Sequence, residues 1–175
     1  MSMILATDVQ YFEGNLAFVA GGLFVDWNSP SFAQTFVCSA GKVPPYESGS
    51  FFKRELPAIL ALLKEIDEKP RAIVVDGYCT LGSANRKGLG AHLFEALAGG
   101  IPIIGVAKNR FKDQPETCEL YRGKSRTPLF VTAVGFSLTD AKRNIETMHG
   151  PYRQPTLLKE VDRLCRQVVP MRPSV

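Results

Sequence analysis

The chain has 175 residues, a formal net charge of +4, 45% hydrophobic residues and 22% charged residues. This composition is typical of a soluble globular protein and excludes disordered and fibrous classes. The length fits one domain, residues 1–175. The longest apolar stretch, Ile101–Ala107, is interrupted by Pro102 and Gly105 and falls well short of the ~20 residues that span a bilayer. The N-terminus lacks a basic segment followed by an apolar one, so we expect a cytoplasmic protein without a membrane partner.

The cysteine spacing indicates the state of the thiols, and the distribution of charge bears on the partner. The four cysteines lie far apart without a CxxC pair, which favours reduced thiols over disulfides or a zinc site. Residues 1–121 carry 11 Lys and Arg against 13 Asp and Glu, whereas residues 122–175 carry 10 against 4. A basic C-terminal third would favour a phosphate backbone, although a solvated basic face explains the skew equally well.

The first third of the chain predicts an antiparallel meander. Its three candidate strands are rich in β-branched and aromatic residues and are separated by turn-forming residues. They are Ile4–Tyr11, Leu16–Val25 and Ser31–Cys38. A Gly- and Pro-rich loop, Gly41–Gly49, follows them.

The rest of the chain alternates helices and strands. The helix expected at 50–68 places its apolar residues on one face, at the 3.6-residue period. Further helices are expected at 88–97, 139–148 and 156–168, and strands at 72–75, 101–107, 119–122 and 129–134. This order predicts an α/β fold: a mixed sheet of a meander plus parallel strands, with helices on both faces.

Three acidic residues lie where an apolar residue is expected. Asp8 interrupts the apolar sequence of the first strand, and Asp76 ends an apolar run at the strand edge where α/β sheets bind ligands. Glu55 falls on the apolar face of its helix. A carboxylate directed toward a core costs several kcal/mol unless a cation offsets it.

Each of these residues has a structural alternative. Asp8 and Asp76 could cap turns, and Glu55 could pair with a buried Arg or Lys. All three together are better explained by convergence at one end of the sheet, where hard oxygen ligands favour Mg²⁺ or Mn²⁺. Such a site suits phosphodiester hydrolysis.

Beyond these carboxylates, short motifs in a specific order resemble the endonuclease V family along nearly the whole chain. The matching segments are Ala6-Thr7-Asp8-Val9, Pro45-Tyr46-Glu47-Ser48-Gly49, Phe52-Lys53-Arg54-Glu55, Val75-Asp76-Gly77, Gly105-Val106-Ala107-Lys108, Arg122-Gly123-Lys124, Pro128-Leu129-Phe130 and Tyr152-Arg153 with Pro155-Thr156. The resemblance implies an RNase H-like fold and Mg²⁺-dependent cleavage of nucleic acid, at the second phosphodiester 3′ to a deaminated base such as hypoxanthine. It also implies a role in DNA repair; separately, we expect a monomer.

The same resemblance implies roles for single residues. Asp8, Glu55 and Asp76 would be catalytic metal ligands, and Lys108 would contact the phosphate or the transition state. Substrate-binding positions follow in the same way: Tyr46 as an aromatic wedge, with Gly49, Arg86, Arg122 and Lys124.

Departures from the family pattern favour an alternative, a nucleic-acid-binding protein with weakened or lost catalysis. A family Gly-His, whose histidine lies at the catalytic centre, reads here as Ala133-Val134, and a His-Pro-Arg loop reads as Ser83-Ala84-Asn85. Asp140 could be a fourth acidic ligand or a helix N-cap residue. A third hypothesis is another two-metal nuclease of RNase H-like fold, with the same metal site and a different substrate.

Overall fold

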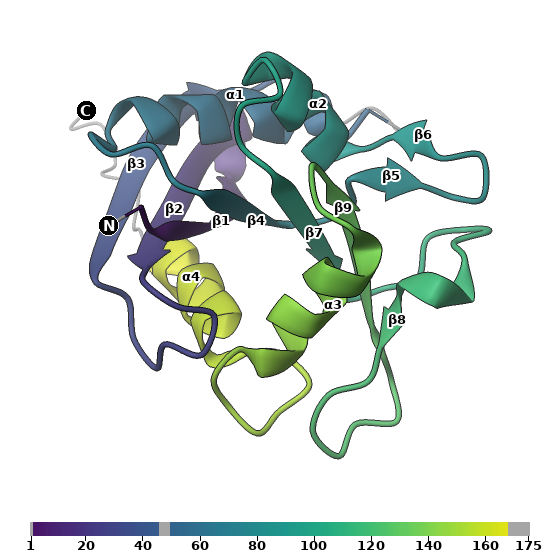
Figure 1. Cartoon of the computed structure of the whole chain (residues 1–175). Coiled ribbons are helices and arrows are strands. Elements are labelled where there is room, and N and C mark those ends of the chain that lie inside the picture. Colours follow the sequence, from purple (N-terminus) through teal and green to yellow (C-terminus); the bar gives the residue numbers. More distant parts are fainter. Residues whose placement is uncertain (1, 46–49, 168–175) are drawn as a thin grey trace, which may run out of the picture.

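The structure, a computed structural model, describes residues 2–45 and 50–167. Its centre is a seven-stranded mixed sheet in the order β3-β2-β1-β4-β7-β9-β8 (Figure 1). The strands are β1 (Ile4–Phe12), β2 (Leu16–Phe24), β3 (Gln34–Lys42), β4 (Ala72–Asp76), β7 (Ile103–Ala107), β8 (Glu119–Leu120) and β9 (Leu129–Val134).

The predicted meander and the parallel strands are both present. β1, β2 and β3 pair antiparallel, β4 pairs parallel to β1, and β7 pairs parallel to β4. β9 pairs antiparallel to β7, and β8 forms the edge of the sheet antiparallel to β9. The runs of β4 and β7 are continuously apolar because helices cover both faces of the sheet at its centre.

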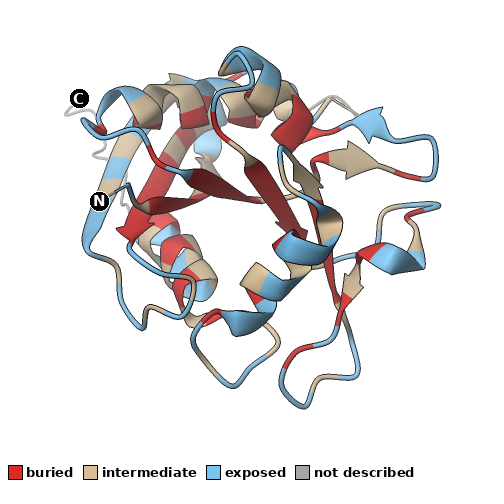
Figure 2. Cartoon of the chain, viewed as in Figure 1, coloured by how far each residue is buried: buried red, intermediate tan, exposed pale blue. Residues whose placement is uncertain are grey.

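Four helices cover the two faces. They are α1 (Phe52–Lys64), α2 (Leu89–Ala96), α3 (Leu138–Thr147) and α4 (Thr156–Arg166). One apolar core lies under α1 and α2, and a second lies under α3 and α4 (Figures 1 and 2). Within the described ranges, none of the helices is long and apolar enough to cross a membrane.

One strand was predicted with the wrong bounds, and one hairpin was not predicted. The third strand was expected at Ser31–Cys38 but begins at Gln34 and continues to Lys42. Phe32 belongs to the preceding loop, where its ring fills the space above Gly22; a Cβ on that glycine would lie 2.3 Å from the ring. The hairpin of β5 (Thr80–Leu81) and β6 (Arg86–Lys87) was not anticipated, because its strands are too short to show a period.

Candidate metal and nucleic-acid site

The strand register brings Asp8 and Asp76 to the same edge of the sheet. The last residue pair of the parallel β1–β4 ladder is Thr7 with Val75, and the two aspartates follow directly. Asp76 pairs in turn with Val106 on β7, and Lys108 lies two residues further along. Asp76 and Lys108 therefore lie at the carboxyl ends of β4 and β7, and Asp8 lies in the middle of β1, where its pairing with β4 ends.

Lys108 is held by one of these carboxylates. Its Nζ donates to Asp76 Oδ2 at 2.9 Å, and both side chains are about one third exposed (35% and 36%). Burial alone would lower the pKa of Lys108, but the charge and hydrogen bond of Asp76 raise it. Lys108 is therefore a permanent cation beside the carboxylates.

A fourth carboxylate, which the sequence did not predict, comes from α4. Asp162 shares a hydrogen bond with Asp8 and lies close enough to Lys108 for that charge to act on it. Burial alone would raise the pKa of Asp162, but hydrogen bonds from Asp8 and Arg166 lower it. On α4 this residue lies at the margin of the apolar face, so its sequence position gives only a weak signal.

Crowding with Asp162 and Asp76 changes the protonation of Asp8. Burial, and then the charges of these two neighbours, raise the pKa of Asp8 to about 8. The hydrogen bond between the two carboxyl groups raises the pKa of Asp8 and lowers that of Asp162, as expected for carboxylates at close range. A bound cation would offset the part of this shift that the neighbouring carboxylates cause.

Glu55 approaches the same edge from the other layer of helices. It lies in the first turn of α1 and is only 4% exposed, as its place on the apolar face predicted. Burial raises the pKa of Glu55 well above its usual value, and the charges of Asp8 and Asp76 add to this shift. The Tyr11 hydroxyl donates to Glu55 Oε1 at 3.3 Å, and this hydrogen bond and the charge of Arg54 partly offset the rise in the pKa of Glu55.

Carboxylate oxygens are suitable ligands for a hard divalent cation, but these carboxylates are not arranged around one common position. Within residues 2–45 and 50–167, no group of three or more His, Cys, Asp or Glu side chains stands ready to hold a metal ion. Each carboxylate has a donor within the protein, since Asp8 Oδ1 accepts from the Val9 amide at 2.9 Å while Glu55 and Asp76 accept from Tyr11 and Lys108. Oxygen donors whose charges repel one another fit Mg²⁺ or Mn²⁺.

Two hollows meet at Asp76 and Lys108. The first, here called the α4 cleft, lies between the strand ends and α4, and includes Asp8, Asp76, Lys108, Gln154, Leu158 and Val161. The second, here called the aromatic pocket, lies on the other side of the Asp76–Lys108 pair. Its remaining walls include Phe51, Phe52, Tyr78, Leu89, Asn109 and Phe111.

The wall of the aromatic pocket is fixed by close packing. Tyr78 donates to the Asn109 carbonyl at 2.7 Å and accepts from the Phe111 amide at 3.1 Å. Behind it, Gly105 of β7 must be a glycine, since a Cβ there would lie 2.6 Å from the Gly77 carbonyl oxygen. The pocket is thus a preformed feature of the fold.

The predicted substrate-binding residues divide into three groups. Tyr46 and Gly49 lie outside the described residues. Arg86 and Lys124 are exposed, and Arg86 stacks over the Phe111 ring at 5.7 Å, at the back of the aromatic pocket. Arg122, by contrast, is buried.

Arg122 is a structural residue rather than a phosphate ligand. It is 6% exposed, and its guanidinium donates to backbone carbonyls in the last turn of α3 and in the segment that joins α3 to α4. These acceptors are Glu146 (3.3 Å), Tyr152 (2.7 Å), Arg153 (3.4 Å), Met148 (2.5 Å) and Gly150 (3.2 Å). With its donors committed in this way, Arg122 cannot also bind a phosphate.

Val134 also lies away from the site. Because β9 runs antiparallel to β7, Val134 pairs with Ile103 at the start of that strand, whereas Lys108 follows its end. Treating this valine as a replaced catalytic histidine was therefore wrong. Asp140 lies in the first turn of α3 and bonds the N-cap residue Ser137, whose Oγ accepts from the Asp140 amide at 3.0 Å and donates to its Oδ2 at 2.7 Å.

Comparison with known proteins decides the family. The sequence profile of Endonuclease V matches residues 1–153. The chain belongs to the endonuclease V family. The Endonuclease V of Streptomyces coelicolor is 34% identical over 143 residues, which are 70% of this chain and 60% of that protein. The chain thus spans less than two thirds of the length of that relative.

Solved endonuclease V structures agree with the fold. That of Bacillus subtilis superposes with a TM-score of 0.78 at 20% identity, covering 95% of this chain and 80% of the other. The Ciona intestinalis enzyme, solved with a 24mer DNA that contains an inosine, gives 0.76 at 18% identity, covering 95% and 84%. The predicted RNase H-like fold is confirmed.

Proposed function

We propose that this chain is a divalent-metal-dependent endonuclease that hydrolyses a phosphodiester bond 3′ to a deaminated base, above all hypoxanthine, in nucleic acid. One observation carries the proposal: the strand register places Asp8 and Asp76 at one sheet edge beside Lys108, and Glu55 from α1 and Asp162 from α4 lie close enough for their charges or hydrogen bonds to act there. Family membership and the inosine-containing DNA bound to the Ciona relative support the substrate.

Asp8, Glu55 and Asp76 would hold the metal, with Asp162 as a further ligand. Mg²⁺ or Mn²⁺ bound there would supply an activated water and charge stabilisation for the leaving oxygen. Lys108 would place its ammonium group against a non-bridging phosphate oxygen, where charge develops in the transition state. Asp76 would orient Lys108 for that contact through the 2.9 Å hydrogen bond.

The aromatic pocket would receive the base. It is apolar, it is preformed, and it shares Asp76 and Lys108 with the α4 cleft. A base displaced from its stack would therefore lie on one side of this pair while a neighbouring phosphate reaches the carboxylates.

A cleavage assay tests the proposal. Inosine-containing single- and double-stranded oligonucleotides, and matched adenosine strands, are incubated with the protein and Mg²⁺ or Mn²⁺. We expect a metal-dependent cut near inosine that Asp8→Ala abolishes. Cleavage no greater than that of Asp8→Ala would refute the proposal, and equal cleavage of the adenosine strands would refute its substrate.

The second candidate function is binding without turnover. It is favoured by the exposed Ser83–Asn85 tip of the β5–β6 hairpin, which replaces the family His-Pro-Arg segment beside the aromatic pocket. Metal-dependent affinity for inosine strands without any cut would support this candidate over the first.

A further inference from the structure

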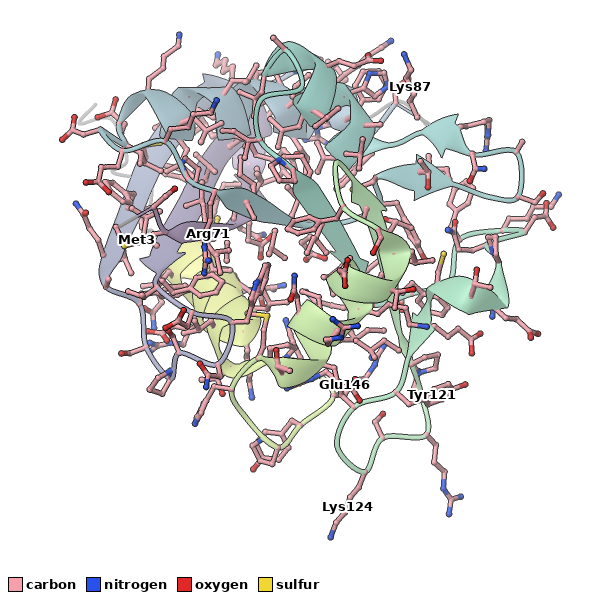
Figure 3. All side chains as sticks on the ribbon, viewed as in Figure 1. Met3, Arg71, Lys87, Tyr121, Lys124 and Glu146 are labelled. Carbon is pink, nitrogen blue, oxygen red and sulfur yellow. The ribbon has the colours of Figure 1, made fainter. Side chains whose placement is uncertain are left out.

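Two loops form a separate hollow next to the α4 cleft. The loop between β8 and β9 contributes Lys124 and Ser125, and the loop between α3 and α4 contributes Pro151, Tyr152 and Arg153. We call it the Tyr152 hollow. Tyr152 is 71% exposed, more than any other large hydrophobic side chain among the described residues. Lys124 extends into solvent from the other loop (Figure 3).

The hollow is held in a defined shape. Gly123 adopts φ +60, and a Cβ at this position would lie 2.2 Å from the Pro151 carbonyl oxygen, so the two loops are in direct contact. Arg122 donates to the carbonyls of Tyr152 and Arg153 from the same side. An exposed tyrosine on a clamped backbone loses little conformational freedom when it binds a partner.

The Tyr152 hollow continues into the candidate active site. Arg153 donates to the carbonyl oxygens of Lys108 and Pro128, the latter at 2.7 Å. The next residue, Gln154, lines the α4 cleft together with Asp8 and Asp76. Because two residues span at most about 7 Å of chain, a strand held at the carboxylates would reach Tyr152 within a few nucleotides.

We propose that the Tyr152 hollow binds the flanking strand of the nucleic-acid substrate, with Tyr152 stacking on an unpaired base and Lys124 binding a backbone phosphate. The inference rests on the proposed function and names a substrate feature: an unpaired flank that extends beyond the cleavage site. An exposed aromatic ring beside cations is the arrangement with which proteins bind single strands. Residues 122–175 carry 10 Lys and Arg against 4 Asp and Glu, which favours a polyanionic partner such as a phosphate backbone.

The test measures binding without turnover. Fluorescence anisotropy in EDTA compares fluorescein-labelled inosine single strands with long flanks on the 5′ side, on the 3′ side, on both sides or on neither. We expect Tyr152→Ala to weaken binding on the order of ten-fold for strands with the relevant long flank, and to leave short strands unaffected. Lys124→Ala should reduce the slope of log affinity against log salt by about 0.7, the value for one phosphate contact on a single strand.

Two matched variants serve as controls. Tyr121 is also exposed, at 56%, but its hydroxyl donates to Glu119 at 2.9 Å, so a carboxylate lies beside it. Lys64 is an exposed lysine in the last turn of α1, on the other face of the sheet. Tyr121→Ala and Lys64→Ala should bind all strands as the wild type does.

The results separate this inference from the proposed function. Wild-type affinity of Tyr152→Ala and Lys124→Ala for long strands, with inosine cleavage intact, would overturn the inference alone. An equal loss for long and short strands would also overturn it, because the hollow would then not contact the flank. If the wild type neither binds nor cuts any inosine strand, the proposed function fails together with the inference.

Discussion

The carboxylate edge and the loops clamped by Arg122 both bury charged side chains, but in opposite ways. At the carboxylate edge, burial raises the pKa values of Glu55 and Asp8, and neighbouring carboxylates add to the rise. At the loops, the Arg122 guanidinium donates to five backbone carbonyls. A buried charge among like charges indicates a binding site that awaits a ligand, whereas a buried charge whose donors are satisfied within the fold indicates a structural role.

The largest expected effect is on stability, at the loops. Arg122→Met leaves several buried carbonyls without a donor, so we expect the free energy of unfolding to fall by about 3 kcal/mol or more. For a domain of this size that corresponds to a drop in Tm of roughly 6–12 °C. Arg143→Met, at an exposed arginine that pairs with Asp140 at 3.2 Å, should change Tm very little. Equal Tm values for the two variants would reject the structural role of Arg122.

At the carboxylate edge, the largest effect should be on catalysis. Lys108→Met removes the ammonium group that would contact the phosphate, and we expect kcat/KM to fall by about 10²–10³-fold. Stability should change by no more than about 1 kcal/mol, because the Lys108–Asp76 pair is partly exposed. If Lys108→Met has the kcat/KM of the wild type, Lys108 does not contribute to catalysis.

Glu55→Gln should make the metal-free protein more stable while abolishing cleavage. The folded pKa of Glu55 is raised, so the destabilisation is absent below the unfolded pKa of about 4.3 and grows as the pH rises above it. Thermal unfolding in EDTA should therefore show a higher Tm for the variant at pH 8 and a smaller difference at pH 5. A lower Tm for the variant at pH 8 would contradict the repulsion described here.

The smallest effects distinguish two acidic residues of the C-terminal helices. Asp140→Ala removes part of the cap of α3 and should cost about 0.5–1 kcal/mol of stability without changing cleavage. Asp162→Ala removes a carboxylate of the site and should reduce cleavage at limiting Mg²⁺. Cleavage rates over a Mg²⁺ titration check both, and the reverse pattern would restore Asp140 as the fourth ligand.

The features that could be predicted from the sequence are those that depend on local periodicity. The buried strands ending at Asp76 and Lys108, and the acidic residue on the apolar face of α1, follow from apolar patterns that a short window contains. Asp162 could not be predicted in this way, because its partner Asp8 lies at the other end of the chain and the packing of α4 on β1 brings them together. The structural role of Arg122 could not be predicted either. Its acceptors are distant backbone carbonyl groups, and because every residue carries one, they leave no pattern in the sequence.

The central claim is that the carboxylate edge is a metal site, and thermal unfolding with added metal tests it most directly. The Tm of the wild type and of Glu55→Gln would be followed at pH 8 while Mg²⁺ or Mn²⁺ is added to EDTA-treated protein. We expect the metal to raise the Tm of the wild type progressively, by relieving the repulsion, and to raise that of Glu55→Gln much less. Equal shifts for both proteins, or none for the wild type, would contradict the account.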